Sequence, residues 1–379
     1  MQLIAGAVKD YPWGVVDGLA PWLGAAAGQH AGQPQAELWF GVHPSGPSPL
    51  IDRNNNDATT NNTTSTTTLA DHLTREQAPV LAKVLAAAQP LSVQVHPNAH
   101  DAKKMWDDQQ IAGPQIFADP YEKAEVLYAL EAFDAFVGWR PAGDAAEIIE
   151  RIEGLALAAA ALHSHDYVTA IQMITERKEQ AADFARQLPA AIHHAHNSGC
   201  LSRQLTDNEI AAYEQAAHDF PEDIGVALTP LLDFTTLASG DAVYLAPGIP
   251  HSYVRGIGFE VMTSSDNVLR LGLTGKPVFI DHALAILDFT TPAQFIRNTA
   301  TSTGTIAPDG AAFRLQVIGK QGELATGSYR LVVAIEGSCE VTVGEQTLHA
   351  HQGRAVAITA EQGPARVASS GRAIAVLAN

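Results

Sequence analysis

Residues 89–98 carry an amide and an imidazole that could bind a metal ion. The segment alternates as a β-strand does, so the side chains of Gln94 and His96 should project to the same face, while the opposite face is apolar and can anchor the strand in a core. Two polar side chains aimed into a fold need a partner, and a divalent metal ion is one such partner. Taken alone, the pair fits two satisfied polar groups better than two metal ligands.

A second imidazole and a guanidinium follow much later in the chain. Residues 247–253 form a turn rich in glycine and proline that delivers His251 to the start of an expected strand, as small β-barrels do when they place a metal ligand in their mouth. Arg270 lies among apolar residues, so its guanidinium is expected to reach inward. An inward arginine needs an anionic partner, which is either a protein carboxylate or a bound ligand.

Two lysines and a carboxylate allow both a structural and a functional interpretation. Residues 119–130 fit a helix or a strand, and a strand would place Lys123 and Glu125 on one face. A surface ion pair is the simpler interpretation of those two. Lys83 interrupts an apolar run at residues 79–88, so it either extends to the edge of the sheet or serves a site.

Other polar side chains are open to structural interpretations. Glu37 and His43, in a strand expected over residues 35–44, either are structural or face a cleft. One group of histidines stands at a helix end before Gly199, where the helix dipole favours cations, and a second group shares a strand face with no companion carboxylate. We interpret both groups as structural: His193, His194 and His196 in the first, and His349 and His351 in the second.

The chain that must position these residues is predicted to be mainly β, with a helical insert. Strand patterns run through the first part and return at Asp233, and between them apolar residues recur at helical spacing in an alanine-rich stretch. Residues 54–68 are too polar to fold and predict a solvated loop, followed by a short helix at 69–77. Short strands separated by glycine turns predict an antiparallel sandwich or barrel near the C-terminus. We expect a first β-domain built from residues 1–143 and 229–300, an all-helical inserted domain at 144–228, and a C-terminal β-sandwich domain at 301–379.

Composition and charge limit the functions open to the protein. Its 379 residues, 46% hydrophobic and 17% charged, are typical of a soluble globular protein with two or three domains. The net charge of −18 argues against a nucleic-acid or acidic-membrane surface, and an anionic substrate would need local positive charge. We find neither a long apolar run nor a signal peptide, and Cys200 and Cys339 lie far apart outside any CxxC motif. We therefore expect a reduced, cytoplasmic protein.

Five segments together, and in this order, resemble the type I mannose-6-phosphate isomerases. The resemblance runs from Tyr11 to about Asp281, is only general in the helical insert, and is weaker in about the last hundred residues of the chain. The two longest strings are highly specific. The segments are AELW at 36–39, KVL at 83–85, QPLSVQVHPN at 89–98, PHSY at 250–253 and SDNVLRLGLT at 265–274.

The resemblance implies a zinc enzyme of cupin, or jelly-roll, architecture that interconverts mannose 6-phosphate and fructose 6-phosphate, with one Zn²⁺ per chain and a second jelly-roll-like domain. On matching positions its metal ligands would be Gln94, His96, Glu125 and His251, and its active-site arginine would be Arg270. Two imidazoles, a carboxylate and an amide oxygen form a mixed nitrogen and oxygen site without thiolate, which suits Zn²⁺.

One motif departs from the family pattern. This chain has Glu122-Lys123-Ala124-Glu125 where the family usually reads His-Lys-Pro-Glu. The ligand Glu125 and the lysine are kept. Glu122 is expected to add negative charge close to where an anionic sugar would bind.

An aldose–ketose isomerase moves a proton between C1 and C2 through an enediolate, so it must stabilise an oxyanion and hold an acid and a base within reach. We assign catalytic roles to Arg270 and Lys123. The identity of the base stays open among Lys123, Glu260 and Asp266. The residues expected to contact the phosphosugar are Lys83, Ser92, Glu260 and Asp266.

Two alternative functions remain at this point. One is a non-catalytic cupin that binds a metal and a sugar phosphate, and the other is an oxygen-using cupin with iron, which a four-ligand set with an inward arginine fits less well. As partners we expect a small phosphosugar, with no nucleic acid and no membrane, and the protein is expected to be a monomer or a weak homo-oligomer.

Overall fold

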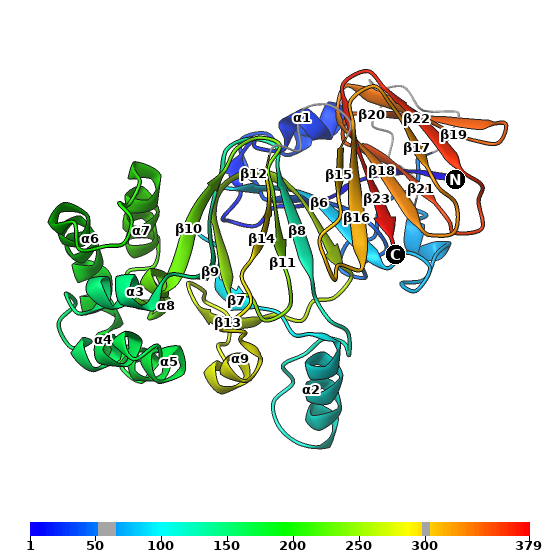
Figure 1. The fold of residues 1–379 in the computed structure, drawn as a ribbon. Coiled ribbons are helices and arrows are strands. Elements are labelled where there is room, and N and C mark those ends of the chain that lie inside the picture. The colour runs from blue at the N-terminus through cyan, green and yellow to red at the C-terminus, as the bar shows by residue number, and fades with distance from the viewer. Residues whose placement is uncertain (52–65, 298–303) are drawn as a thin grey trace.

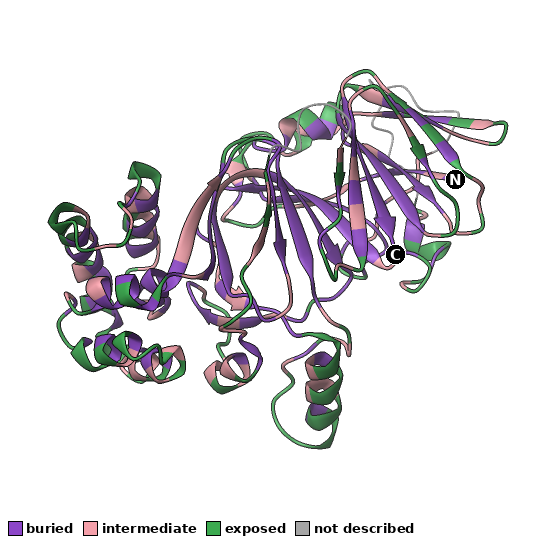
Figure 2. Cartoon of the chain, viewed as in Figure 1, coloured by how far each residue is buried: buried purple, intermediate pink, exposed green. Residues whose placement is uncertain are grey.

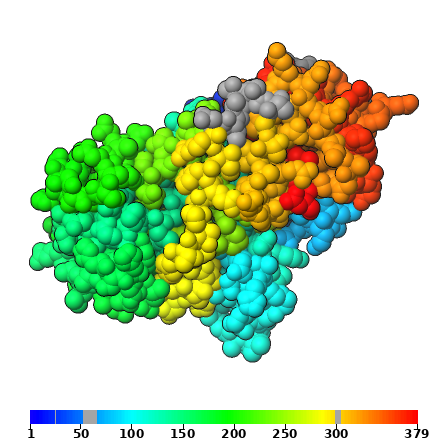
Figure 3. Space-filling model, viewed as in Figure 1, coloured from blue at the N-terminus to red at the C-terminus, as the bar shows by residue number. Residues whose placement is uncertain are grey.

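The computed structural model describes residues 1–51, 66–297 and 304–379, so the expected loop at 54–68 lies mostly outside the described residues. Two β-sandwiches lie side by side, and a helical domain projects from the first sandwich on the side away from the second (Figures 1 and 3). The prediction of a mainly β chain with a helical insert is thereby confirmed. None of the helices in the described parts of the chain is long and apolar enough to cross a membrane.

The first sandwich contains two sheets that share one long strand, β12 (His251–Thr263). The second half of β12 pairs with β6 and β8, and its first half pairs with β7 and β9. Gly256 lies between the two halves at φ 133°, where a Cβ atom would come within 2.7 Å of the carbonyl oxygen of Ala132, so the change of sheet requires glycine here. The larger sheet has the order β14 (Gln294–Ile296), β11 (Ala242–Leu245), β8 (Glu125–Ala129), β12, β6 (Val80–Ala87), β5 (Glu37–Phe40) and β2 (Ala7–Lys9), and the smaller contains β10 (Leu232–Leu237), β9 (Phe133–Trp139), β7 (Val93–Val95) and β13 (Leu269–Gly272).

The second sandwich includes the first strand of the chain. Strand β1 (Gln2–Ala5) pairs with β21 (Arg354–Ile358), so it lies in the C-terminal β-domain rather than in the first domain, where residues 1–143 were expected. The other expected boundaries stay predictions. The six-stranded sheet has the order β1, β21, β18 (Arg330–Glu336), β23 (Arg372–Ala378), β16 (Phe313–Ile318) and β15 (Gly304–Ile306), and the four-stranded sheet has β17 (Gln321–Leu324), β22 (Ala365–Ser369), β19 (Ser338–Val343) and β20 (Gln346–His351).

Helices form the insert, and a few shorter helical segments lie outside it. Helix α6 ends at Gly199 in the left-handed conformation, as its sequence predicts, and α7 begins at Thr206, whose side chain accepts a hydrogen bond from the amide of Glu209. The expected helix at 69–77 is wrong: only the 3₁₀ turn η3 (Leu69–Asp71) forms, because so short a segment gains too little from helix formation without packing. The insert contains α3 (Ala142–Ile149), α4 (Ala156–His163), α5 (Tyr167–Thr175), η4 (Lys178–Gln180), α6 (Ala181–Ser198), α7 (Asp207–Asp219), α8 (Gly225–Leu228) and η5 (Thr229–Leu231). Outside it are β3 (Val15–Val16), α1 (Ala20–Leu23), η1 (Gly24–Gln29), β4 (Pro34–Gln35), α2 (Ala99–Ile111) and α9 (Ile280–Ile286).

Alternation along the strands gives the larger sheet of the first sandwich two different faces. The outer face packs Val84 and Val126 against Val333 and Val376 of the second sandwich in one continuous core (Figure 2). Each such fully buried side chain contributes about 1.5–3 kcal/mol to folding. The inner face, toward the smaller sheet, is apolar at one end around Leu127. At its other end the inner face carries charged residues: Glu37, Lys83, Glu125 and Glu260.

Candidate metal centre and active-site cavity

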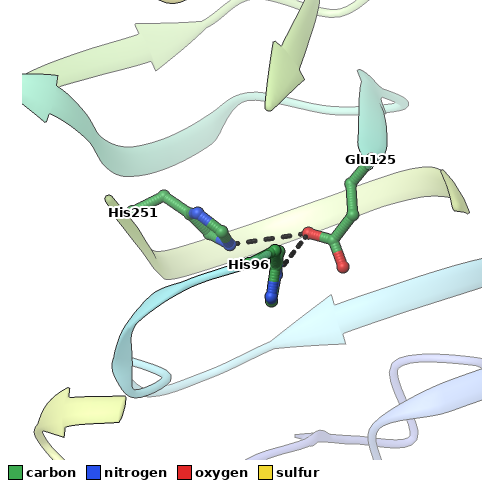
Figure 4. A group of neighbouring side chains, drawn as sticks. All are labelled: His96, Glu125 and His251. Carbon is green, nitrogen blue, oxygen red and sulfur yellow. Dashed lines mark ion pairs between the residues drawn. The ribbon is translucent and has the colours of Figure 1, made fainter. Parts of the chain in front are cut away.

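Two histidines and a glutamate from three separate strand ends meet inside the first sandwich. Glu125 begins β8, His251 begins β12, and His96 directly follows β7. Glu125 Oε2 lies 3.4 Å from His96 Nε2 and 3.5 Å from His251 Nε2, and all three side chains are buried (Figure 4). The structure thus brings three of the four predicted ligands to one point.

The hydrogen bonds of the two imidazoles leave their Nε2 lone pairs facing the carboxylate. His96 Nδ1 lies 3.2 Å from the carbonyl oxygen of Asn267, and His251 Nδ1 lies 3.1 Å from that of Ile249. Because a carbonyl oxygen only accepts, each Nδ1 carries the proton and each Nε2 is left as an acceptor. Burial, together with the charge of Lys123, lowers the pKa of His96 to about 3, so this ring is neutral near pH 7.

Three electron-pair donors therefore converge with no proton between them. Their ligand atoms all lie within 4.8 Å of one another. His96 Nε2 and Glu125 Oε2 are buried and have no hydrogen-bond partner within the described residues, although buried polar atoms are normally paired. A cation between them would satisfy both. Two imidazoles oriented by backbone carbonyls and one carboxylate form the donor set of a zinc site, so the residues fit such an ion.

Gln94, the fourth predicted ligand, adjoins this cluster through its amide group. Strands β7 and β12 pair at Gln94 and His251, which places Gln94 Nε2 3.1 Å from His251 Nε2. Gln94 Oε1 instead accepts a hydrogen bond from Ser92 Oγ at 3.0 Å. The amide nitrogen, not the oxygen, faces the cluster in this arrangement, so coordination by Gln94 stays a prediction. Ser92 orients the amide and also lines the neighbouring cavity.

Lys123 holds the second oxygen of the glutamate. Its Nζ lies 3.0 Å from Glu125 Oε1, and both side chains are less than a tenth exposed, so the pair is buried rather than on the surface. Burial alone would raise the pKa of Glu125, but the ammonium of Lys123 lowers it well below its ordinary value. Glu125 is therefore ionised and can face a cation with one oxygen and the lysine with the other.

A cavity of about 440 Å³ adjoins the cluster and is lined by eight of the ten predicted site residues, with the two histidines behind it. Lys83, expected either to reach the sheet edge or to serve a site, lies in its wall. Lys83 Nζ is 3.0 Å from Glu260 Oε2 and 3.3 Å from Glu37 Oε1. Burial lowers the pKa of Lys83, but the two carboxylates raise it above its ordinary value overall. Its charge is thus shared with two protein carboxylates.

Two more groups in the cavity wall have raised pKa values. Burial raises the pKa of Glu260, although the ammonium of Lys83 opposes this. Burial also raises the pKa of Tyr253 well above its ordinary value, and Tyr253 Oη is a buried atom without a hydrogen-bond partner among the described residues. Tyr253 was noted above only as the last residue of the PHSY segment. Its place on β12, two residues after His251, is the signal that was available, because residues two apart on a strand share a face.

The rim of the cavity carries two cations that form no ion pair with any residue the structure describes. Neither the guanidinium of Arg270 nor the ammonium of Lys276 makes an ion pair within the described residues, and both line the cavity. Burial and the charge of Arg270 lower the pKa of Lys276, so the two positive groups lie close together. Arg270 was predicted to reach inward, whereas Lys276 was missed.

The helical insert fixes this rim. Helix α8 packs backbone against backbone on β13. A Cβ atom on Gly272 would lie only 2.3 Å from the Cα atom of Gly225, so this close contact requires glycine. The carboxylate of Asp223 accepts hydrogen bonds from the amides of Leu273 and Thr274, both at 2.9 Å. Leu273 has φ 55°, a strained value for a non-glycine residue that these contacts hold in place.

Asn267 ties the metal cluster to the segment that leads into β8. Its side chain accepts from the amide of Ala118 at 2.9 Å and donates to the carbonyl oxygens of Asp119 and Tyr121 at 2.7 and 2.8 Å. Its own carbonyl oxygen accepts from His96, as described above. Asn267 was noted above only as part of the SDNVLRLGLT segment. Nothing in the local sequence indicates that this asparagine is buried and bridges segments that are far apart in the chain.

The remaining charged residues near the cavity are Asp266 and Glu122. Asp266 lines the cavity as predicted, and Asp266 Oδ2 lies 3.1 Å from His43 Nε2. Glu122 is not among the described residues that line the cavity, and its carboxylate acts on Tyr244, which packs in the outer core. The expectation that Glu122 adds charge beside the substrate is not supported by the described residues that line the cavity.

Comparison with known proteins places these features in a family. A sequence model described as phosphomannose isomerase type I, catalytic domain, matches residues 1–142. The mannose-6-phosphate isomerase of Salmonella typhimurium is 30% identical over 98% of both chains, and that of Escherichia coli is 28% identical over 98% of both chains.

Solved structures agree over the full length. A zinc-bound mannose 6-phosphate isomerase superposes with a TM-score of 0.75 at 26% identity, and the Salmonella typhimurium enzyme bound to its substrate and to zinc superposes with a TM-score of 0.75 at 25% identity. Each alignment covers 100% of this chain and 99% of the other. Because the similarity extends over the whole chain in both sequence and fold, this protein belongs to the type I phosphomannose isomerase family.

Proposed function

We propose that this protein is a zinc-dependent mannose-6-phosphate isomerase that interconverts mannose 6-phosphate and fructose 6-phosphate. The observation that carries the proposal is a cluster of three buried donor atoms without a shared proton. It lies beside a cavity whose rim holds two cations with no ion pair in the described parts of the chain. The relatives are named for this reaction, and one of them is a structure with substrate and zinc bound. The non-catalytic alternative has no feature of its own in its favour.

The metal would be held by His96, Glu125 and His251, with Gln94 as the predicted fourth ligand. When bound, zinc supplies Lewis-acid stabilisation of negative charge on the oxygens of C1 and C2. The protein keeps the ligands in the required state, because the backbone carbonyls fix the tautomers of both histidines and Lys123 holds the carboxylate ionised.

The phosphate of the substrate would bind at the rim, between Arg270 and Lys276. Arginine and lysine without protein partners are the groups expected to meet a phosphate dianion, and a chain with a net charge of −18 needs such a local positive site. This differs from the expected role of Lys83, whose ammonium already has two carboxylate partners.

Of the three candidate bases, Glu260 has the most suitable properties. A base close to neutral pH needs a raised carboxyl pKa, which burial gives to Glu260, whereas the hydrogen bond from His43 lowers the pKa of Asp266. Lys123 forms an ion pair with Glu125, and its ammonium would supply a proton or stabilise the oxyanion. We therefore assign the transfer between C1 and C2 to Glu260, with Lys123 and Arg270 assisting.

Cellular setting is part of the same proposal. We propose a cytoplasmic enzyme that works as a monomer or a weak homo-oligomer on a cupin scaffold. In support, the thiols of Cys200 and Cys339 are free, as expected in a reducing compartment.

A coupled assay on mannose 6-phosphate tests the function directly. The protein as purified, after removal of metal with a chelator, and after return of Zn²⁺ is compared at equal concentration. We expect activity, its loss, and its recovery with about one zinc per chain. Binding of mannose 6-phosphate without turnover in the zinc-loaded protein would contradict the proposal and favour the non-catalytic cupin.

A further inference from the structure

His43 is a buried histidine beside the cavity that has no role in the function proposed above. Its side chain is 5% exposed, and it is not one of the described residues that line the cavity. Its Nε2 nevertheless lies 3.1 Å from Oδ2 of Asp266, which lines the cavity and whose side chain is 50% exposed. A ring in the protein interior thus contacts a carboxylate that lines the cavity.

The surroundings of His43 fix both its orientation and its proton. Its Nδ1 accepts a hydrogen bond from the amide of Ser45 at 3.2 Å, so the proton of the neutral ring is on Nε2 and is donated to Asp266. The amide of Gly46 donates to the carbonyl oxygen of His43 at 2.9 Å and closes a turn with proline in its second position. The ring packs edge-on against Trp39 at 5.1 Å between centroids. The His43 ring therefore has little freedom to rotate.

Asp266 stands near the two rim cations without pairing with them. Burial lowers the pKa of Arg270 and of Lys276, and the charge of Asp266 opposes this in both, so the carboxylate acts on both groups. No ion pair joins Asp266 to either cation in the described parts of the chain. Its own pKa is lowered chiefly by the hydrogen bond from His43. The carboxylate is therefore ionised, and its Oδ2 is engaged with the histidine.

We propose that His43 is a positioning residue that anchors Asp266 in the cavity wall, so that Asp266 accepts a hydrogen bond from a sugar hydroxyl and leaves Arg270 free for the phosphate. The proposal rests on the function proposed above and names residues that select for a phosphorylated sugar. Without the anchor, the carboxylate would turn toward the guanidinium, because opposite charges a few ångströms apart attract in a partly buried site. The protein would then neutralise its own phosphate site.

The test combines four variants of the zinc-loaded full-length protein: His43→Ala, His43→Gln, Asp266→Asn and the double variant His43→Ala with Asp266→Asn. The dissociation constant of fructose 6-phosphate is measured by calorimetry, and kcat and KM are measured by the coupled assay. We expect His43→Ala to raise both the dissociation constant and KM about tenfold with little change in kcat, because it removes a hydrogen bond to a charged group that acts in binding. His43→Gln keeps a donor near the position of Nε2 and should recover most of the affinity.

Non-additivity distinguishes positioning from a general structural effect. In the Asp266→Asn background, His43→Ala should have no further effect on either constant, since it acts only through Asp266. The matched control is His193→Ala, which removes an exposed histidine–glutamate pair of 2.9 Å with Glu214 in the helical insert and should change nothing.

Four results would contradict one of the two proposals or both. Multiplicative effects of the two substitutions, or a His43→Ala variant with lowered melting temperature and unchanged KM, would show that His43 does not act through Asp266. A wild-type protein that binds fructose 6-phosphate without turnover would contradict the isomerase function, and the dissociation constants of the variants would still decide the role of His43. Absence of binding would contradict both.

Discussion

The two β-sandwiches have similar layers but opposite interiors. One end of the inner face in the first sandwich is charged and holds the buried cluster and the cavity. In the second sandwich the space between the sheets is filled by apolar side chains such as Val332, Val341 and Val367, each at most 2% exposed. The described residues form no second group of potential metal ligands there. A sandwich of this kind is thus a scaffold, and the types of its inward side chains decide whether it has a site.

Two arginines show the same difference in detail. Arg330, in the second sandwich, is fully buried, and its terminal nitrogens donate to the carbonyl oxygens of Ala325, Thr359, Gln362 and Gly363 at 2.7–3.1 Å. Arg270, in the first, has no such partners among the described residues. A guanidinium whose two terminal nitrogens are paired with backbone carbonyls stabilises loops, whereas one without such partners beside a cavity is available to a ligand.

The largest effect should come from removing a ligand in the polar interior. His251→Ala should lower bound zinc, measured by elemental analysis, to near zero and reduce turnover about 10³-fold or more, because Lewis-acid stabilisation of the oxyanion is lost. The matched control in the second sandwich is His349→Ala, on an exposed strand face beside Glu340 at 3.2 Å. It should leave zinc and turnover unchanged. Full zinc content in His251→Ala would contradict the assignment of His251 as a metal ligand and of the first sandwich as the one that binds metal.

The two arginines should fail in different ways. Arg270→Ala should keep fold and zinc but lose about 10²–10³-fold in turnover, because the charge it stabilises is that of the bound substrate. Arg330→Ala should lower the free energy of unfolding by about 3 kcal/mol, because buried carbonyls lose their donors, and the remaining folded protein should stay active. Denaturant unfolding and the coupled assay on both variants check this. Wild-type rates in Arg270→Ala would contradict a role of Arg270 in catalysis. An inactive but stable Arg330→Ala variant would contradict a purely structural role of Arg330.

The polar interior should also make the metal-free protein sensitive to acid. The pKa of His96 is about 3 in the folded chain and 6.5 ordinarily, so between these pH values the unfolded chain binds a proton that the folded chain does not. The free energy of unfolding should therefore fall as the pH is lowered from 6.5 toward 3, by up to about 1.4 kcal/mol per pH unit from this group, with no contribution above 6.5. Unfolding of chelator-treated wild type and His96→Asn at pH 7 and pH 5 measures it. Parallel pH dependence in the two proteins would contradict the assignment.

Strand alternation is local, so the sequence could indicate which polar side chains share a face, whereas the ligand set itself was implied by the resemblance to the family. Gln94 and His96 share a face by their spacing alone, and Glu125 joins Lys123 once residues 119–130 are taken as a strand. The strand form of that segment was ambiguous by pattern, and pairing of β8 with β12 and β11 decides it. Here the tertiary context, not the local pattern, fixes the structure.

What the sequence could not show depends on register between distant strands. Lys83 meets Glu260 because β6 and β12 pair at these residues, and no local pattern reveals that register. Lys276 reaches the rim because Asp223, in the helical insert, holds the turn before it. In the same way, nothing in the four residues of β1 indicates that its partner lies near the other end of the chain.

The smallest expected effect tests whether the two sandwiches are independent. Tyr128 lies on β8 three residues after Glu125 but on the outer face, and its hydroxyl accepts a hydrogen bond from Arg372 Nη1 of the second sandwich at 3.2 Å. Tyr128→Phe removes that bond and should lower the free energy of unfolding by about 1 kcal/mol, while Arg372 keeps its ion pair with Glu336. Zinc affinity and kcat should not change, because the inner face of β8 is fixed by its pairing with β11 and β12. A weaker zinc affinity in this variant would show that the second sandwich acts on the metal centre through β8. The second sandwich would then contribute to metal binding in the first, although its own interior is apolar.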